Sequence, residues 1–435
     1  MADSKVRVCY YHDPTIGGFY YNPGHPMKPH RLSLTHSLVL NYGLHKKMKV
    51  YRPHRATHEE LLEFHTEGYL SFLKECNPGN VNDHTAGCRN YIAGDDCPMF
   101  DGVYKYCQSY TGGTLEGAQK LINGEADIAI NWAGGLHHAR KEEASGFCYV
   151  NDIVLGILEL LKYHPRVLYI DIDIHHGDGV QDAFYNTDRV MCVSFHKYGG
   201  GFFPGTGDIE ETGMGRGKNY SLNVPLSDGV DDHMYVELFR DVIGKVMRFY
   251  RPTAVVFQSG ADSLQCDRLG CFNLTLKGHA KCLAFVKNYG LPTLLVGGGG
   301  YTIKNVARCW TYETSVCLDT ELENDLPFNE YLAFFGPDFR LHPPPQPLYS
   351  NQNTRRDIED IKRNIAETLR SLDCAPSVQM RQLPSEAFQS SFLQTMESGD
   401  APDIRIPEQD DDNYVQHEAE FYEDEADNDG EPAGF

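Results

Sequence analysis

The sequence predicts an α/β protein in which one parallel β-sheet lies between helical layers. Short apolar runs of strand length alternate along the chain with longer segments of helical pattern. The runs are apolar on both faces, as strands are when helices cover a sheet on both sides. Polar motifs follow directly after the runs, at the edge where open α/β sheets bind their ligands.

Five strands and four helices stand out. We expect strands at 127–131, 166–174, 190–195, 253–258 and 291–296, and helices at 151–163, 233–250, 275–288 and 355–372. No linker interrupts this alternation before about residue 340, so the pattern indicates one large domain, to which we assign 1–376. The remainder, 377–435, is acidic and poor in apolar residues, and we expect it to be disordered.

The composition narrows the class of protein. Of 435 residues, 41% are hydrophobic, an ordinary globular value. No apolar stretch approaches the roughly 18 residues of a membrane helix, and the N-terminus has no signal-peptide core, so we expect an intracellular protein without a membrane partner. The 13 cysteines lack CxxC pairs, which predicts free thiols. The net charge is −22, which argues against direct DNA binding.

The most unusual motif is YIDIDIHHGDG, in which a core strand runs into acids and histidines. On a strand, residues two apart face one side, so Asp171, Asp173 and His175 are expected to project together. Asp262, in SGADS, follows another strand. Two carboxylates and one imidazole with an open position are typical of a catalytic metal site, for Zn²⁺ or Fe²⁺. The alternative, salt bridges with arginines, explains less because a histidine pair accompanies the acids.

Histidines 137 and 138 form a second motif, GGLHHA. The preceding Gly134–Gly135 allows the backbone to turn and bring both rings towards the metal site. Two imidazoles there are suited to general base and general acid catalysis, each oriented by a carboxylate such as Asp171 or Asp178. The alternative is a pair of core histidines with satisfied hydrogen bonds.

The motif GGGGYT and two aromatic loops complete the candidate site. Glycines 297–300 allow Tyr301 to reach over a substrate, where its phenol can donate to an oxyanion. A phosphate-binding loop is disfavoured because the P-loop lysine and GxGxxG spacing are missing. Gly146–Phe147 and Phe202–Phe203 are expected to line an apolar channel, although plain core packing remains the alternative.

Taken together, long motifs of this chain resemble class I zinc-dependent histone deacetylases. They are NWAGGLHHARKEEASGFCYVND, YIDIDIHHGDGV, SFHKYGGGFFPGTGD, SGADSL, CDRLGCFNLT and GGGGYT, with PGHPMKPHR and AGDDCPMFDG. The resemblance runs from about Lys5 to Pro376. It implies the arginase/deacetylase fold and zinc-dependent hydrolysis of N6-acetyl-lysine in histones and other proteins, with release of acetate, by the catalytic subunit of a transcriptional corepressor complex. Alternatives are a deacetylase-like scaffold and a hydrolase of acetylated polyamines. Gly177 lies where binuclear arginases have a further acid.

The resemblance assigns roles to individual residues. One Zn²⁺ would be held by Asp173, His175 and Asp262. His138 would be the general base, with His137, Asp171, Asp178 and Tyr301 as the other catalytic residues. Substrate contacts fall on Asp96, Gly146, Phe147, Phe203 and Leu269, and an inner cavity for acetate on Met27, Arg31 and Cys148. Structural K⁺ sites fall on Asp171, Asp173, His175, Ser194 and Phe195, and on Phe184, Thr187, Val190 and Tyr220.

The resemblance also implies regulation and partners. An activating inositol tetrakisphosphate would contact Tyr20, Gly24, Lys28, Arg268 and Lys304, where Tyr20 replaces a histidine and Lys304 an arginine of the family pattern. The implied partners are acetylated histone tails and other acetyl-lysine proteins, and a nuclear receptor corepressor with a SANT-type domain. The implied location is the nucleus, and also the cytoplasm. The loop YGGGFFPG and the acidic tail most resemble the branch of the class that nuclear corepressor complexes hold.

Overall fold

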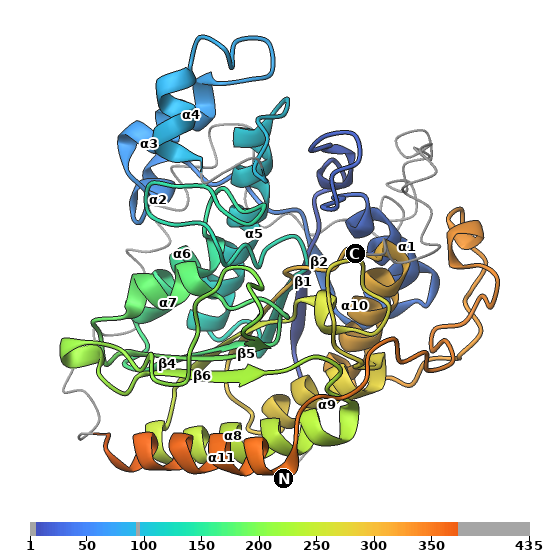
Figure 1. The fold of residues 1–435 in the computed structure, drawn as a ribbon. Coiled ribbons are helices and arrows are strands. Elements are labelled where there is room, and N and C mark those ends of the chain that lie inside the picture. The colour runs from blue at the N-terminus through green and yellow to red at the C-terminus, as the bar shows by residue number, and fades with distance from the viewer. Residues whose placement is uncertain (1–5, 93–95, 373–435) are drawn as a thin grey trace.

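A computed structural model describes residues 6–92 and 96–372 (Figure 1). Its strands are β1 (Val8–Tyr11), β2 (Lys49–Tyr51), β3 (Ile128–Asn131), β4 (Val167–Asp171), β5 (Val190–Lys197), β6 (Ser221–Leu226), β7 (Ala254–Gln258) and β8 (Thr293–Val296). They form one eight-stranded sheet in the order β2-β1-β3-β8-β7-β4-β5-β6, and every neighbouring pair is parallel. The single parallel sheet that the sequence predicts is therefore confirmed.

Helices cover both faces of this sheet. They are α1 (Arg31–Asn41), α2 (His58–Leu62), α3 (Glu67–Glu75), α4 (Thr85–Tyr91), α5 (Val103–Ile122), α6 (Asp152–Leu161), α7 (Asp178–Phe184), α8 (Asp232–Tyr250), α9 (Leu276–Lys287), α10 (Ile303–Cys317) and α11 (Arg355–Arg370). The 3-10 turns are η1 (Ile16–Gly18), η2 (Leu44–Lys47), η3 (Gly215–Gly217), η4 (Ala261–Ser263) and η5 (Leu332–Phe335). Figure 1 shows α8 and α11 side by side beneath the strands and α5, α6 and α7 on the other side.

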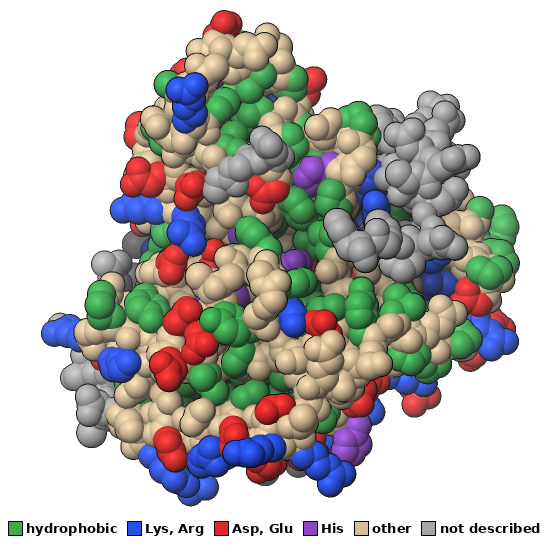
Figure 2. All heavy atoms as spheres, viewed as in Figure 1, with side chains coloured by type: hydrophobic (Ala, Val, Ile, Leu, Met, Phe, Trp, Pro, Cys, Tyr) green, Lys and Arg blue, Asp and Glu red, His purple; other side chains and the backbone are tan. Residues whose placement is uncertain are grey.

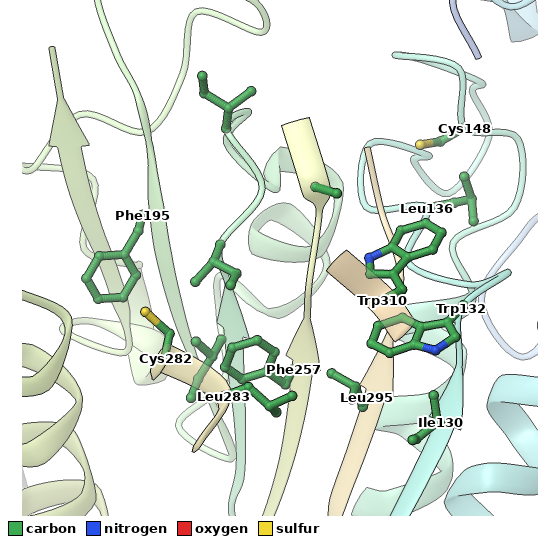
Figure 3. Close-up of a cluster of buried hydrophobic side chains, with 14 of the residues drawn as sticks. Ile130, Trp132, Leu136, Cys148, Phe195, Phe257, Cys282, Leu283, Leu295 and Trp310 are labelled. Carbon is green, nitrogen blue, oxygen red and sulfur yellow. The ribbon is translucent and has the colours of Figure 1, made fainter. Parts of the chain in front are cut away.

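Alternate strand residues enter two separate cores, which is why the strands read as continuous apolar runs. On β4, Tyr169 joins the core under α5 and α6, whereas Leu168 and Ile170 join the larger core that includes α8 and α9. Figure 3 shows part of the larger core, where Trp132 and Trp310 stack with ring planes 4° apart and centroids 5.3 Å apart. The sheet is thus buried on both sides and holds its loops on a rigid frame.

The four helices predicted from sequence begin where a side chain caps them. Asn151, Asp231, Thr275 and Thr354 each accept a hydrogen bond from a backbone N–H of the first helical turn. Such a cap satisfies a donor that the helix itself leaves unpaired. The observed starts therefore lie within one residue of the predicted ones.

The structure differs from the sequence prediction in several elements. The strand expected at 166–174 ends at Asp171, and β1, β2 and β6 were not predicted. The expected tail, 377–435, lies outside the described residues. All twelve cysteines of the described part are free thiols, and all but Cys88 and Cys266 are buried. Among residues 6–92 and 96–372, no helix is long and apolar enough to cross a membrane.

Candidate active site

The motifs singled out in the sequence meet at one edge of the sheet. The loops come from β3, β8, β7 and β4, which are consecutive in the sheet and parallel, so their carboxyl ends are neighbours. Histidine side chains are visible near the middle of the face in Figure 2, among hydrophobic ones. The strand order thus brings segments more than 100 residues apart in sequence to one place.

Asp173, His175 and Asp262 form a buried triad. His175 Nδ1 lies 3.1 Å from Asp173 Oδ1 and 3.0 Å from Asp262 Oδ2, a spacing at which one ion can contact all three. Asp173 and His175 were expected on a strand, but β4 ends before them at Asp171. Instead the N–H of Asp173 donates to Asp171 Oδ1, and the N–H of His175 donates to Asp173 Oδ1, both at 3.0 Å. Consecutive turns closed by aspartates therefore bring the ligands together.

Hydrogen bonds fix the outer oxygens of both carboxylates. Asp173 Oδ2 accepts from Gln258 Nε2 at 2.9 Å and from the Gly299 N–H at 2.8 Å, and Asp262 Oδ1 accepts from the Ile174 N–H at 2.9 Å. Burial lowers the pKa of His175, but its hydrogen bonds to the two acids outweigh this and raise it to about 10. The two carboxylates therefore favour a positive charge at this point, and a bound metal ion would supply it in place of the proton on His175 Nδ1.

The two histidines of GGLHHA differ in protonation. His137 Nδ1 donates to Asp171 Oδ2 at 2.8 Å, and His138 Nδ1 donates to Asp178 Oδ1 at 2.7 Å. Burial opposes charge on His137, but Asp171 and Asp173 outweigh it and raise the pKa to about 9. Burial and the charge of His137 lower the pKa of His138 to about 4. At neutral pH, His138 is therefore a neutral base beside a histidinium.

The first turn of α6 holds the histidine loop, a contact that the sequence analysis missed. The Asp152 carboxylate accepts from the N–H groups of Gly135 and Leu136 at 3.0 to 3.1 Å and from Thr114 Oγ1 at 2.6 Å. Gly135 has φ of 99°, and a Cβ there would clash with the backbone of Gly297. The loops after β3 and β8 therefore touch through glycine, as the expected turn requires.

Aromatic rings surround the metal triad. The ring of Phe147 meets Tyr301 edge-on at 5.6 Å between centroids, and the ring of Phe203 meets His138 edge-on at 4.9 Å. Phe202 stacks on His175 at 5.1 Å. Phe203 is 42% exposed, whereas Tyr301 is 5% exposed. These rings pack around the site itself, with Phe203 at the surface and Tyr301 inside.

Several of the residues that were expected to contact the substrate or to line an inner cavity contact the same loops. The Asp96 carboxylate accepts from the Gly146 N–H at 2.9 Å, and Leu269 is exposed. Arg31 is buried and donates to the carbonyl oxygens of Gly298 and Gly300, at 2.6 and 2.7 Å. Met27 and Cys148 are buried as well.

The expected cation and inositol phosphate residues stay predictions. Asp171 of β4 pairs with Ser194 of β5 in the sheet register, and the Thr187 N–H donates to the carbonyl of Phe184. In the inositol phosphate set, Lys28 Nζ lies 5.7 Å from the centre of the Tyr20 ring. The tyrosine that departs from the family pattern thus faces one of the expected phosphate-binding lysines.

A second cluster of possible ligands, His279, Cys309 and Glu313, lies behind the metal triad. His279 Nε2 donates to the Gly260 carbonyl at 2.9 Å and Nδ1 donates to Glu313 Oε1 at 2.8 Å. Glu313 Oε2 accepts from Ser259 Oγ at 2.5 Å. These hydrogen bonds account for the cluster as a support for the loop that carries Asp262.

Comparison with known proteins gives a family that agrees with this fold and site. A family model described as "Histone deacetylase domain" matches residues 25–317. The chain belongs to the histone deacetylase family. It is 56% identical over 427 residues to "Histone deacetylase 1" of Homo sapiens, covering 98% of this chain and 88% of that protein. It is 59% identical over 405 residues to "Histone deacetylase B" of Dictyostelium discoideum, covering 92% and 96%. This histone deacetylase is therefore a hydrolase of the lysine deacetylase type, with the α/β fold of its family.

Proposed function

We propose that this histone deacetylase hydrolyses N6-acetyl-lysine in histones and other proteins with one Zn²⁺ held by Asp173, His175 and Asp262. The observation that carries the proposal is the convergence of a buried Asp-His-Asp triad with two histidines whose Nδ1 atoms are each held by a carboxylate. A bound divalent metal ion supplies a Lewis acid for the amide carbonyl and for the attacking water. Fe²⁺ also suits the donor set.

The side chains would then move the protons. His138 Nε2 takes a proton from the attacking water, because His138 is neutral and its Nδ1 is held by Asp178. Tyr301 donates its phenol proton in a hydrogen bond to the developing oxyanion, and the histidinium of His137 stabilises the same charge. A protonated histidine gives its proton to the leaving lysine nitrogen. Phe147 and Phe203 would flank the apolar lysine stem, and Asp96 would accept from the peptide backbone.

Metal and activity should be lost together. Asp262→Ala in the full-length chain removes one carboxylate ligand, so we expect loss of both bound zinc and acetyl-lysine peptide hydrolysis. Asp241→Ala, on α8 and ion-paired with Lys245, is the control and should change neither. Full peptide hydrolysis by a metal-free preparation would contradict the proposal. Acetylated polyamines as a second substrate test the alternative hydrolase, and an inactive wild type with normal zinc content would favour a scaffold.

Within the class, we propose that the chain is most like histone deacetylase 3 and works in a nuclear corepressor complex, with a cytoplasmic pool. The YGGGFFPG loop and the acidic tail support this branch. The relatives described above carry other names, so binding of a corepressor fragment is needed to test this assignment. A SANT-type corepressor fragment should copurify with the chain and raise its deacetylase rate, and failure of both would count against this branch.

We also propose that inositol tetrakisphosphate activates the corepressor-bound enzyme through Lys28, Arg268 and Lys304, with K⁺ filling the structural cation sites. Lysine at 304 keeps the charge but not the bidentate geometry of arginine, so binding is weaker than an arginine version would show. Lys304→Arg should tighten binding of the inositol phosphate, and Arg268→Ala should abolish activation. An unresponsive complex at low salt would show that Tyr20 and Lys304 have removed the site.

A further inference from the structure

Asp267, in the motif CDRLGCFNLT, joins two loops of the site, although the resemblance assigns it no role. It is 6% exposed and accepts hydrogen bonds from four backbone N–H groups. Its Oδ1 accepts from Leu269 at 2.9 Å and from Gly270 at 3.1 Å. Its Oδ2 accepts from Tyr301 at 2.8 Å and from Thr302 at 3.3 Å.

The two oxygens serve different segments. The bonds to Oδ1 close a local turn, which aspartate does in many proteins. The bonds to Oδ2 cross to the segment after β8, 34 residues further along the chain. Thr302 Oγ1 adds a second tie between the same loops, because it donates to the Cys266 carbonyl at 2.7 Å. The local turn uses only Oδ1 of Asp267, so Oδ2 is available to hold the segment after β8.

The bond to Oδ2 bears on the position of Tyr301. The four residues before it are glycines, so no side chain of that segment packs to hold it. Its main-chain supports include the Arg31 bonds to Gly298 and Gly300, the bonds of Gly299 with Asp173 and Ala261, and the bond to Asp267, which is the one made by the N–H of Tyr301 itself. An oxyanion donor must lie within tenths of an ångström of its place, and a shift of about 1 Å can cost roughly 100-fold in rate.

We propose that Asp267 is a positioning residue that holds Tyr301 in its catalytic place and, by the same carboxylate, holds the rim residue Leu269. It touches neither substrate nor metal in this arrangement and acts through the backbone of both loops. The inference rests on the oxyanion role proposed above for Tyr301.

Asp267→Asn is the sharpest probe of this role. The amide keeps the size of the side chain but has only one acceptor oxygen, so one of the two segments must face an N–H₂ group. The N–H groups of Leu269 and Gly270 are closer in sequence, so they are expected to keep the amide oxygen as their acceptor. The Tyr301 and Thr302 N–H groups then lose their acceptor, and the phenol moves.

A double-mutant cycle separates positioning from plain stabilisation. Asp267→Asn is measured in the wild-type chain and in Tyr301→Phe, with kcat and KM on acetyl-lysine peptide, metal content and thermal unfolding recorded for each. The control is Asp232→Asn, because Asp232 also ties distant segments by accepting from the N–H and hydroxyl of Thr275, between α8 and α9. All variants are full-length, with a corepressor fragment if the wild type needs one.

We expect Asp267→Asn to lower kcat by about 10- to 100-fold in the wild-type chain and by less than about threefold in Tyr301→Phe, with unchanged metal content. Asp232→Asn should keep wild-type kcat. Equal losses in both backgrounds, or no loss in either, would overturn the inference. If Asp267→Asn does not fold, Asp267→Ser replaces it, because serine can close the local turn but cannot reach Tyr301. Full activity of Tyr301→Phe would instead refute the role of the tyrosine itself.

Discussion

His137 and His138 show how neighbouring residues of one type acquire different chemistry. Each Nδ1 donates to a carboxylate, but His137 also lies near Asp173, with 3.9 Å between its Nε2 and Asp173 Oδ2. The extra negative charge keeps a proton on His137, and that proton in turn disfavours one on His138. The two histidines therefore have the different protonation states that the proposed roles of base and electrostatic support require.

His138→Ala tests this division at the level of one side chain. The change removes the proposed base and leaves the metal ligands, so kcat should fall at least roughly 100-fold. Zinc content and the far-ultraviolet circular dichroism spectrum should match those of the wild type. A variant with wild-type turnover would mean that another group accepts the proton from water.

The buried pair of His279 and Glu313 gives a prediction about stability. Glu313→Leu leaves a buried imidazole without its carboxylate, which typically costs about 3–5 kcal/mol. Replacing both residues by leucine removes the uncompensated group, so the double variant should be more stable than Glu313→Leu alone. Chemical denaturation of the two variants and the wild type measures the difference. A double variant less stable than the single one would show that the pair contributes more than mutual compensation.

At the scale of elements, the loop from Ser145 to Cys148 lies between Asp96 and His138. Gly146 has φ of 52°, and a Cβ there would clash with the imidazole of His138 and crowd Phe203. Its N–H donates to Asp96. The absence of a side chain at Gly146 thus lets this loop lie directly against the imidazole of His138.

Gly146→Ala should lower kcat/KM for acetyl-lysine peptide by roughly 10- to 100-fold, because the methyl group displaces His138. Gly124→Ala is a matched control, since Gly124 has φ of 65° but no atom within 4 Å of the added Cβ. It carries the same backbone strain without the clash. Similar losses in both variants would assign the effect to strain or folding.

The sequence predicted those parts of the site that its own motifs contain. Asp173, His175, Asp262 and the histidine pair were found because acids and histidines directly after apolar runs are unusual. Their supports were missed for a physical reason. Gln258 and Asp152 carry side chains that ordinarily cap helices or face water, and their partners lie 85 and 17 residues away. Only the folded path of the chain, which local patterns do not contain, brings such partners together.

At the scale of the whole molecule, buried neutral histidines make stability depend on pH. Burial lowers the pKa of His12, His30 and His65 to about 4. In His65, Nδ1 donates to the Lys141 carbonyl and Nε2 accepts from the Asn151 N–H, so a second proton would break a hydrogen bond. Because the folded-state pKa lies below the unfolded value of about 6.5, their contribution is complete above pH 6.5 and is lost as pH falls towards 4.

For each such histidine, the free energy of unfolding should therefore fall by about 1.4 kcal/mol for each unit by which the pH is lowered between about 6.5 and 4. Thermal or denaturant unfolding between pH 7.5 and 5 measures the slope. The glutamine of His65→Gln can keep one donor and one acceptor but does not titrate. The slope of unfolding free energy against pH should therefore be smaller in this variant by the contribution of one histidine. The same slope in both proteins would show that His65 titrates normally.

The strand order also has a consequence for biosynthesis. The strands β2, β1 and β3 form one half of the sheet and β4, β5 and β6 the other. Within the sheet, the halves are joined by β7 and β8, which are the last strands in the described part of the chain. A nascent polypeptide that has left the ribosome only as far as β6 therefore exposes an unpaired edge on β3 and another on β4. Such edges aggregate unless they are covered. The chain should depend on chaperones until Val296 has emerged, and fragments that stop before this residue should be insoluble.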